Sequence, residues 1–436
     1  MIRQTFPDGC TFRLRPLYVV MHRWVGLSIA AFVVISGLTG AIISWDREID
    51  EWLNADIMRT QADGPLLDPL VLGARVLASD PRIEISYMPL ALEPGHAASF
   101  LVRPRPALAT GTPFRLDYDN VFVDPVTGRI TGRRDSRAVS FSRRNLMPFL
   151  RSIHESLHLP AFLGTDRWGY WITGSVALLW VLDSLVAMCL TWPLPLKKAV
   201  QPVRPPAHWL RRWRPSWGVR WRAGGYRLTF DVHRAVGLWV WGVILIIAFT
   251  SFSLNLYREV FYPALSLLSQ TTPGPYETQV PAPYGTRIQP KIGFAQAVEI
   301  ARQEARRRGF PFPPAGIYYG GGYRFYNVSF FDPADEAGAQ GMGLSNLYID
   351  GDDGSVLGEY RPWHGTAADV FVQLQLPLHS GRILGLTGRI LMSFMGLAVA
   401  LLALTGIMIW NRKRKGRSRK PPVARTARDG YQASPM

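Results

Sequence analysis

Residues 22–45 read HRWVGLSIAAFVVISGLTGAIISW, and this stretch decides the fold. After the opening His-Arg pair, the stretch reaches Trp45 without a charged residue. About 20 apolar residues are enough for a helix to cross roughly 30 Å of hydrocarbon. Similar blocks occupy residues 168–192, about 235–256 and about 390–410. Four such blocks are too many for the buried helices of one soluble core, so the sequence predicts a membrane bundle of four transmembrane helices.

The distribution of charge predicts how the chain lies in the membrane. Lysine and arginine number 49 against 32 acidic residues, which gives a net charge of +17. The basic residues concentrate in the N-terminal segment, in residues 197–234 and in the tail after Trp410. An even number of spans puts these three segments on one side, and the positive-inside rule makes that side cytoplasmic. The basic character therefore indicates membrane topology and contact with anionic lipid, not nucleic-acid binding.

The remaining sequence falls into two outer segments of about 100 residues, each the size of a small domain. In the second, the periodicity of residues 294–307 predicts a helix, and the alternating aromatic stretch 323–331 predicts a strand. The expected fold is thus a four-helix membrane bundle with two periplasmic α+β domains.

The sequence divides the chain into eight predicted units. The first four are the cytoplasmic N-terminus with the first span (1–45), the first outer domain (46–150), the second span with a preceding histidine motif (151–196) and a basic loop (197–232). The last four are the third span (233–258), the second outer domain (259–370), the fourth span (371–411) and a basic tail (412–436).

Two motifs occur twice in the same order. HRWVGL at 22–27 returns as HRAVGL at 233–238, an offset of 233 − 22 = 211. VFVDPVTGRITG at 121–132 returns as LYIDGDDGSVLG at 347–358, where the motif aspartates differ by 350 − 124 = 226. In each of the latter pair, Asp and Gly supply the turn of a β-hairpin. The sequence therefore predicts an internal two-fold duplication.

Five of the eight histidines lie at the ends of the predicted spans, and they form two layers. His22 and His233 open the first and third spans on the inner side. On the outer side, His379 precedes the fourth span, and His154 and His158 precede the second. Histidines at equal depth on facing helices can bind the two faces of one haem iron. We therefore expect a haem between His22 and His233, and another between His379 and one of the two histidines before the second span.

Residues near these histidines extend the prediction. His154 and His158 are four apart, so on a helix they would share a face, with one as ligand and the other bonding a propionate or the substrate. Arg23, Arg234 and Arg382 stand beside histidines and are candidate propionate partners. Asp183 is an intramembrane carboxylate, either functional or bonded to a neighbouring helix. Cys10 and Cys189 cannot form a periplasmic disulfide. A metal site or purely structural histidines remain alternatives to haem.

The chain resembles the PepSY-associated transmembrane family. The resemblance rests on HRWVGL, on HESLHLP before the second span, on DVHRAVGLW at the third, and on LPLHSGRILGLTGR and LALTGIMIW at the fourth. It covers nearly the whole chain except the basic tail. It implies that the two outer segments are PepSY-like domains and that His22, His154, His233 and His379 are the axial ligand candidates, with His158 as a local alternative.

Well-understood members of this family are similar to di-haem ferric-siderophore reductases of the bacterial inner membrane. The resemblance implies two haem b groups per chain and an electron path to a ferric siderophore in the periplasm. No nucleotide-binding motif occurs, so electrons would come from a separate reductase or from membrane quinol. Two other functions stay open: a non-enzymatic PepSY protein that binds peptides or regulates a partner, and an accessory or permease for siderophore uptake.

Overall fold

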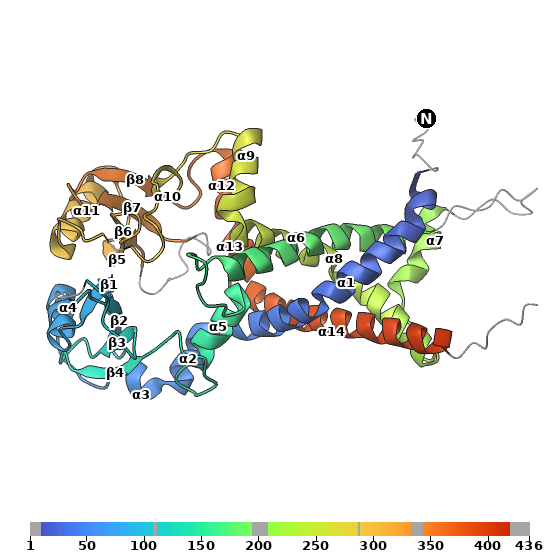
Figure 1. The fold of residues 1–436 in the computed structure, drawn as a ribbon, viewed down its shortest axis with the longest axis horizontal. Helices are drawn as coiled ribbons and strands as arrows, with labels where there is room; N and C mark the ends of the chain where they lie inside the picture. The colour runs from blue at the N-terminus through green and yellow to red at the C-terminus, as the bar shows by residue number, and fades with distance from the viewer. Residues whose placement is uncertain (1–9, 108–110, 194–207, 287, 333–342, 419–436) are drawn as a thin grey trace, which may run out of the picture.

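The computed structural model describes residues 10–107, 111–193, 208–286, 288–332 and 343–418. It has two parts, a bundle of long helices and an antiparallel β-sheet beyond one end of that bundle (Figure 1). Among the basic residues of the predicted cytoplasmic segments, Arg3, Lys197, Lys198, Arg204 and those after Ser418 lie outside the described ranges.

Among the described residues, four helices are long and apolar enough to cross a membrane, which confirms the four predicted spans. Their apolar side chains meet in a cluster that includes Ile29, Val33, Ile244 and Val399. The first helix packs chiefly against the fourth, and the second against the third. The four are α1 (Cys10–Ile43), α6 (Trp168–Thr191), α8 (Gly225–Asn255) and α14 (Gly385–Ser418).

Glycines bring α1 and α14 into backbone contact. A Cβ atom on Gly396 would lie 2.2 Å from the carbonyl oxygen of Gly37, and one on Gly37 would lie 2.8 Å from the carbonyl oxygen of Gly396. Small residues at helix crossings allow this closeness in membranes. The position of each helix in this pair is therefore fixed by the other.

The two outer segments form one continuous sheet of eight strands in the order β4-β3-β2-β1-β5-β6-β7-β8. Each segment contributes four neighbouring strands, and β1 joins β5 antiparallel through the pairs Tyr87↔Tyr318 and Met88↔Ile317. The sequence predicted two separate domains, and no local pattern indicates this joint. The strands are β1 (Ile83–Pro89), β2 (Ala98–Pro104), β3 (Asn120–Val123), β4 (Ile130–Arg134), β5 (Pro314–Gly320), β6 (Phe325–Phe330), β7 (Ser345–Asp350) and β8 (Val356–Tyr360).

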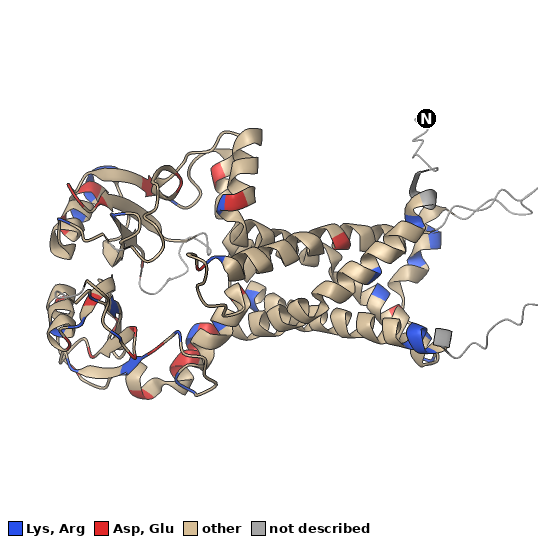
Figure 2. Cartoon of the chain, viewed as in Figure 1, with Lys and Arg blue, Asp and Glu red and all other residues tan. Residues whose placement is uncertain are grey.

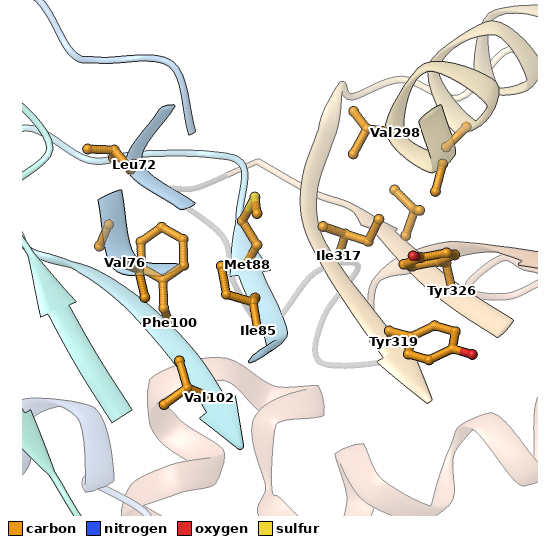
Figure 3. Packing of buried hydrophobic residues seen from close by; sticks show 14 of the residues in the cluster. Leu72, Val76, Ile85, Met88, Phe100, Val102, Val298, Ile317, Tyr319 and Tyr326 are labelled. Atoms are coloured by element: carbon orange, nitrogen blue, oxygen red, sulfur yellow. The ribbon is translucent and has the colours of Figure 1, made fainter. Parts of the chain in front are cut away.

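A single apolar core crosses the joint between β1 and β5. Two amphipathic helices, α4 (Pro69–Ala78) and α11 (Phe294–Arg308), pack on the sheet from the two halves. Figure 3 shows Leu72 of α4 near Phe100, and Val298 of α11 near Ile317. The predicted helix at 294–307 and the strand within 323–331 are thus confirmed, with boundaries shifted by one or two residues.

The two predicted hairpins have the same turn. The carboxylate of Asp124 accepts hydrogen bonds from the backbone N–H groups of residues 126 and 127, and that of Asp350 accepts from 352 and 353. Gly128 and Gly354 then adopt φ values of +71° and +79°, which a residue with a Cβ atom rarely takes. The D-x-x-x-G pattern therefore formed the hairpins that it predicted.

Short helices connect the bundle to the sheet and close its other end. Two of them, α5 and α13, carry histidines and pack against the spans α1 and α8 respectively. The connecting elements are α2 (Asp46–Leu53), α3 (Ala55–Met58), α5 (Leu146–Ser156), α7 (Trp209–Trp213), η1 (Arg214–Trp217), η2 (Tyr257–Phe261), α9 (Tyr262–Leu268), α10 (Pro275–Thr278), α12 (Ala367–Gln373), α13 (Gln375–Ser380) and η5 (Arg382–Leu384).

The two ends of the bundle differ in charge. At the end remote from the sheet, around α7 and the end of α14, the charged residues are almost all Lys and Arg, whereas acidic and basic residues are mixed in and near the sheet (Figure 2). The helices themselves are almost free of charge along their length in this view. The described parts of the basic segments that the sequence placed on one side lie together at that end (Figure 2).

Candidate functional site

The inner pair of histidines comes from two helices of the bundle. His22 on α1 and His233 on α8 face each other with ring centroids 6.1 Å apart and ring planes inclined by 48°. His22 belongs to the first copy of the HRxVGL motif, and His233 belongs to the second. The structure thus brings together the two residues that the sequence assigned to an inner layer.

The outer pair has almost the same geometry. His154 on α5 and His379 on α13 have ring centroids 6.0 Å apart, and their planes are also inclined by 48°. From His22 to Ser36, the residue of α1 that contacts His154, there are 36 − 22 = 14 positions. A helix rises 1.5 Å per residue, so the two pairs are separated by roughly 21 Å along the bundle. That distance covers most of the hydrocarbon thickness of a bilayer.

The Nδ1 atom of each inner histidine is bonded to a neighbouring helix. His22 Nδ1 lies 3.0 Å from the carboxylate of Asp183 on α6. His233 Nδ1 lies 3.1 Å from the carbonyl oxygen of Leu402 and 3.0 Å from the hydroxyl of Thr405, both on α14. Since a carbonyl or carboxylate oxygen accepts, Nδ1 carries the hydrogen and donates it.

The outer histidines are held in the same way. His154 Nδ1 donates to the carbonyl oxygen of Ser36 at 3.0 Å and lies 3.2 Å from the hydroxyl of Thr39. His379 Nδ1 lies 3.1 Å from the hydroxyl of Thr250, and this histidine also bonds the backbone of Ile247. In all four rings Nδ1 is engaged, which leaves Nε2 as the nitrogen with a free lone pair. Metal-binding histidines characteristically have this arrangement, because the second bond fixes the tautomer and the ring orientation.

The spacing of the rings fits two imidazoles on opposite faces of a haem. A bond from imidazole nitrogen to a first-row metal is about 2 Å, so two such bonds in line, with the radii of the rings added, separate the centroids by roughly 6 Å. Both pairs have this separation. Within the described residues, no group of three or more His, Cys, Asp or Glu side chains is placed to hold a bare metal ion. The donor set therefore suits a cofactor that brings its own equatorial ligands.

A cavity of about 860 Å³ surrounds the inner pair. This volume is within the range of pockets that hold cofactors and drug-sized ligands. Its wall is mainly apolar and aromatic, with Trp180 and Trp241 among the lining residues. Cationic side chains also line it, and they come from three of the four spans: Arg15, Arg23, Arg234, Lys413 and Arg414.

Glycines give the histidine rings their room. A Cβ atom on Gly40 of α1 would lie 2.8 Å from the ring of His154, and one on Gly406 of α14 would lie 3.4 Å from the ring of His233. The first distance is shorter than real Cβ contacts, so a side chain at Gly40 would displace the ring.

His158 has a different place from the one the sequence suggested. Helix α5 ends at Ser156, and both Leu157 and His158 adopt positive φ, at 56° and 52°. His158 therefore does not share a helical face with His154. Its Nδ1 bonds the hydroxyl of Ser152 at 2.8 Å, and its ring lies edge-on to Phe149. The histidine that faces His379 is His154.

The three candidate arginines lie close to the pairs in sequence, but only two line the cavity. Arg23 and Arg234 are part of its wall, and Arg234 also pairs with Asp231 at 3.2 Å. Arg382 is in η5, directly after the helix that carries His379.

The other three histidines do not belong to either pair. His96 bonds Glu51, His208 caps α7, and His364 bonds a nearby carbonyl oxygen.

The sequence pointed to Asp183, the partner of His22, but not to the threonines that bond the other rings. Thr39, Thr250 and Thr405 were not singled out, because a threonine within an apolar block is an ordinary helix residue. A signal was nevertheless present. Thr39 and Thr250 differ by 250 − 39 = 211, the same offset that separates His22 from His233.

The fold and the site define a class of protein: a polytopic membrane protein whose four-helix bundle presents two facing pairs of histidines at different depths. A family model for the PepSY-associated TM region matches residues 19–413. The chain belongs to this family. No curated protein matches the chain.

Proposed function

We propose that the chain is a haem-dependent transmembrane oxidoreductase that passes electrons from the cytoplasmic side, or from quinol, to a ferric siderophore in the periplasm. The observation that carries the proposal is the matched geometry of the two histidine pairs, each with ring centroids about 6 Å apart and each Nδ1 bonded to a neighbouring helix. Structural histidines at helix ends would not need to repeat both features.

The chain would hold two haem b groups. His22 and His233 would bind one, and His154 and His379 the other. Haem supplies one-electron transfer when it is bound. The chain contributes the fixed ring orientations, an apolar wall that excludes water, and cations such as Arg23 and Arg234 for the propionates. Arg382 is the corresponding candidate on the outer side.

The proposal includes an internal duplication. His154 contacts Ser36 and Thr39 of α1, and His379 contacts the backbone of Ile247 and Thr250 of α8. Ser36 and Ile247 differ by 211 positions, and so do Thr39 and Thr250, the same offset that relates the two HRxVGL motifs. Equivalent spans thus hold equivalent histidines. The two four-stranded halves of the sheet, each ending in the same Asp-Gly hairpin, would be the PepSY-like domains.

The substrate assignment rests on the family likeness set out from the sequence and on the arrangement of the molecule. The sheet lies beyond the end of the bundle that holds the outer pair (Figure 1). With the basic end in the cytoplasm, the sheet would be periplasmic. Reduction of Fe(III) to Fe(II) there would weaken a chelate of hard oxygen ligands and release the metal.

The test is the haem content and activity of the full chain purified in detergent from haem-replete cells. We expect a low-spin haem b spectrum, two haems per chain by pyridine haemochrome assay, and oxidation of the dithionite-reduced protein by a ferric trihydroxamate chelate with Fe(II) trapped by a chromogenic chelator. His22→Ala and His379→Ala should each remove one haem, and the double variant both. His96→Ala is the matched control and should keep two.

A folded, monodisperse protein without haem would refute the proposal. Haem that is bound but never oxidised by ferric chelates would refute the reductase assignment and leave haem binding intact. Loss of haem in His96→Ala to the same extent would show that the histidine pairs are not the determinants.

A further inference from the structure

The two histidine pairs match in geometry but differ in what holds their rings. Three of the four rings donate Nδ1–H to neutral oxygens, which are backbone carbonyls and threonine hydroxyls. His22 alone among the four donates to a carboxylate, with 3.0 and 3.1 Å to the two oxygens of Asp183. The inner site therefore has one anionic hydrogen-bond acceptor on a ligand candidate, and the outer site has none on either of its two.

We propose that Asp183 lowers the reduction potential of a haem held by the inner pair, relative to one held by the outer pair. Electrons would then flow from the inner to the outer side. This inference rests on the proposed function. Asp183 is a positioning residue, because it acts through His22. With haem held by both pairs, an electron from quinol or a cytoplasmic reductase would pass from the site of His22 and His233 to that of His154 and His379, and would there reduce Fe(III) in the chelate to Fe(II).

The physical cause is the strength of the bond to Nδ1. A hydrogen bond to an ionised acceptor is roughly twice as strong as one to a neutral acceptor, and it makes the imidazole a stronger donor through Nε2. A stronger donor stabilises the oxidised metal, and hydrogen bonding to ligands is one of the means by which proteins set haem potentials. The carboxylate is only 8% exposed within the bundle, so water weakens this bond little.

Cations around the inner cavity act in the opposite direction, since positive charge favours the reduced form. The charge of Arg234 is offset by its ion pair with Asp231. Arg15 donates to the carbonyl oxygens of Leu190 and Trp192 at the end of α6, which hold it without neutralising it. In the proposed complex, propionates would neutralise further cationic charge. Asp183 by contrast bonds a ligand candidate directly.

The experiment measures midpoint potentials in chains that keep one site each. His379→Ala leaves the inner site and His22→Ala leaves the outer site, so each optical redox titration reports a single midpoint. In the His379→Ala background, Asp183→Asn should raise the midpoint by at least about 59 mV, a tenfold change for one electron. In the His22→Ala background the same substitution should leave the midpoint unchanged.

Two further variants keep the inference testable if Asp183→Asn loses its haem. Asp183→Glu retains a carboxylate and should keep a midpoint below that of any neutral replacement. Thr39→Asp in the His22→Ala background places a carboxylate beside His154 and should lower the outer midpoint.

An unchanged inner midpoint in Asp183→Asn, or an unchanged outer midpoint in Thr39→Asp, would overturn the inference while haem binding stands. A wild-type chain that binds no haem would overturn the proposed function together with it.

Discussion

At the scale of single residues, the site depends on glycines that leave room for the histidine rings and on hydroxyl groups that hold those rings. Gly40 has no side chain where His154 needs room, and Gly406 has none beside His233. The hydroxyls of Thr39 and Thr250 then hold the two outer rings. Each histidine is thus oriented by a helix other than its own, so the site forms only when the whole bundle has assembled.

Gly40→Ala tests this dependence. A Cβ atom at 2.8 Å from the ring of His154 must push the ring away, and disturbances of such supporting contacts typically cost 10–100-fold in metal affinity. We expect the outer haem to be lost or weakly bound, with the haem-to-protein ratio falling from two towards one. Gly242→Ala is the control, because a Cβ there meets nothing within 4 Å and the gain in helix propensity is similar. Equal haem contents in the two variants would contradict the prediction.

At the scale of elements, the sequence predicted what depends on local pattern and missed what depends on tertiary contact. Four apolar blocks predicted the spans, and the Asp-Gly pattern predicted both hairpins, because hydrophobic length and turn chemistry are local. The joint between β1 and β5 was not predictable, since the backbone pairs at Tyr87↔Tyr318 leave no mark in either segment. His158 was misplaced because the helical spacing was extended to it, although Pro160 lies two residues further on and helix α5 ends at Ser156 in a left-handed turn.

The crossing of α1 and α14 yields a prediction at this scale. In Gly396→Ala, the new Cβ would lie 2.2 Å from the carbonyl oxygen of Gly37, so the helices must separate. Overpacking of this kind costs about 1–3 kcal/mol. We expect a lower thermal midpoint in detergent, and weaker haem binding at both sites, because α1 and α14 together hold His22, the partners of His154 and those of His233. Gly416→Ala, on the same helix but with nothing within 4 Å, should match the wild type; an equally large effect there would assign the loss to helix α14 itself and not to the crossing.

At the scale of the whole molecule, the two halves of the chain are coupled at both ends. In the bundle, α1 of the first half packs on α14 of the second. In the sheet, the strands of the two halves share one apolar core. Each histidine pair takes one member from each half. A direction across the membrane then follows from how the molecule is inserted, and the excess of basic over acidic residues at the end of the bundle remote from the sheet is the feature that would set it (Figure 2).

The orientation gives the last prediction. Val139 lies in the segment before α5 and is 71% exposed, and Trp221 lies before α8 at the basic end and is 72% exposed. In a background with both native cysteines replaced by serine, Val139→Cys should react with a membrane-impermeant maleimide in intact cells. Trp221→Cys should react only after permeabilisation, because cytoplasmic basic segments determine orientation. The reverse pattern would put the sheet in the cytoplasm, and a periplasmic ferric chelate could not then be the acceptor at the outer pair.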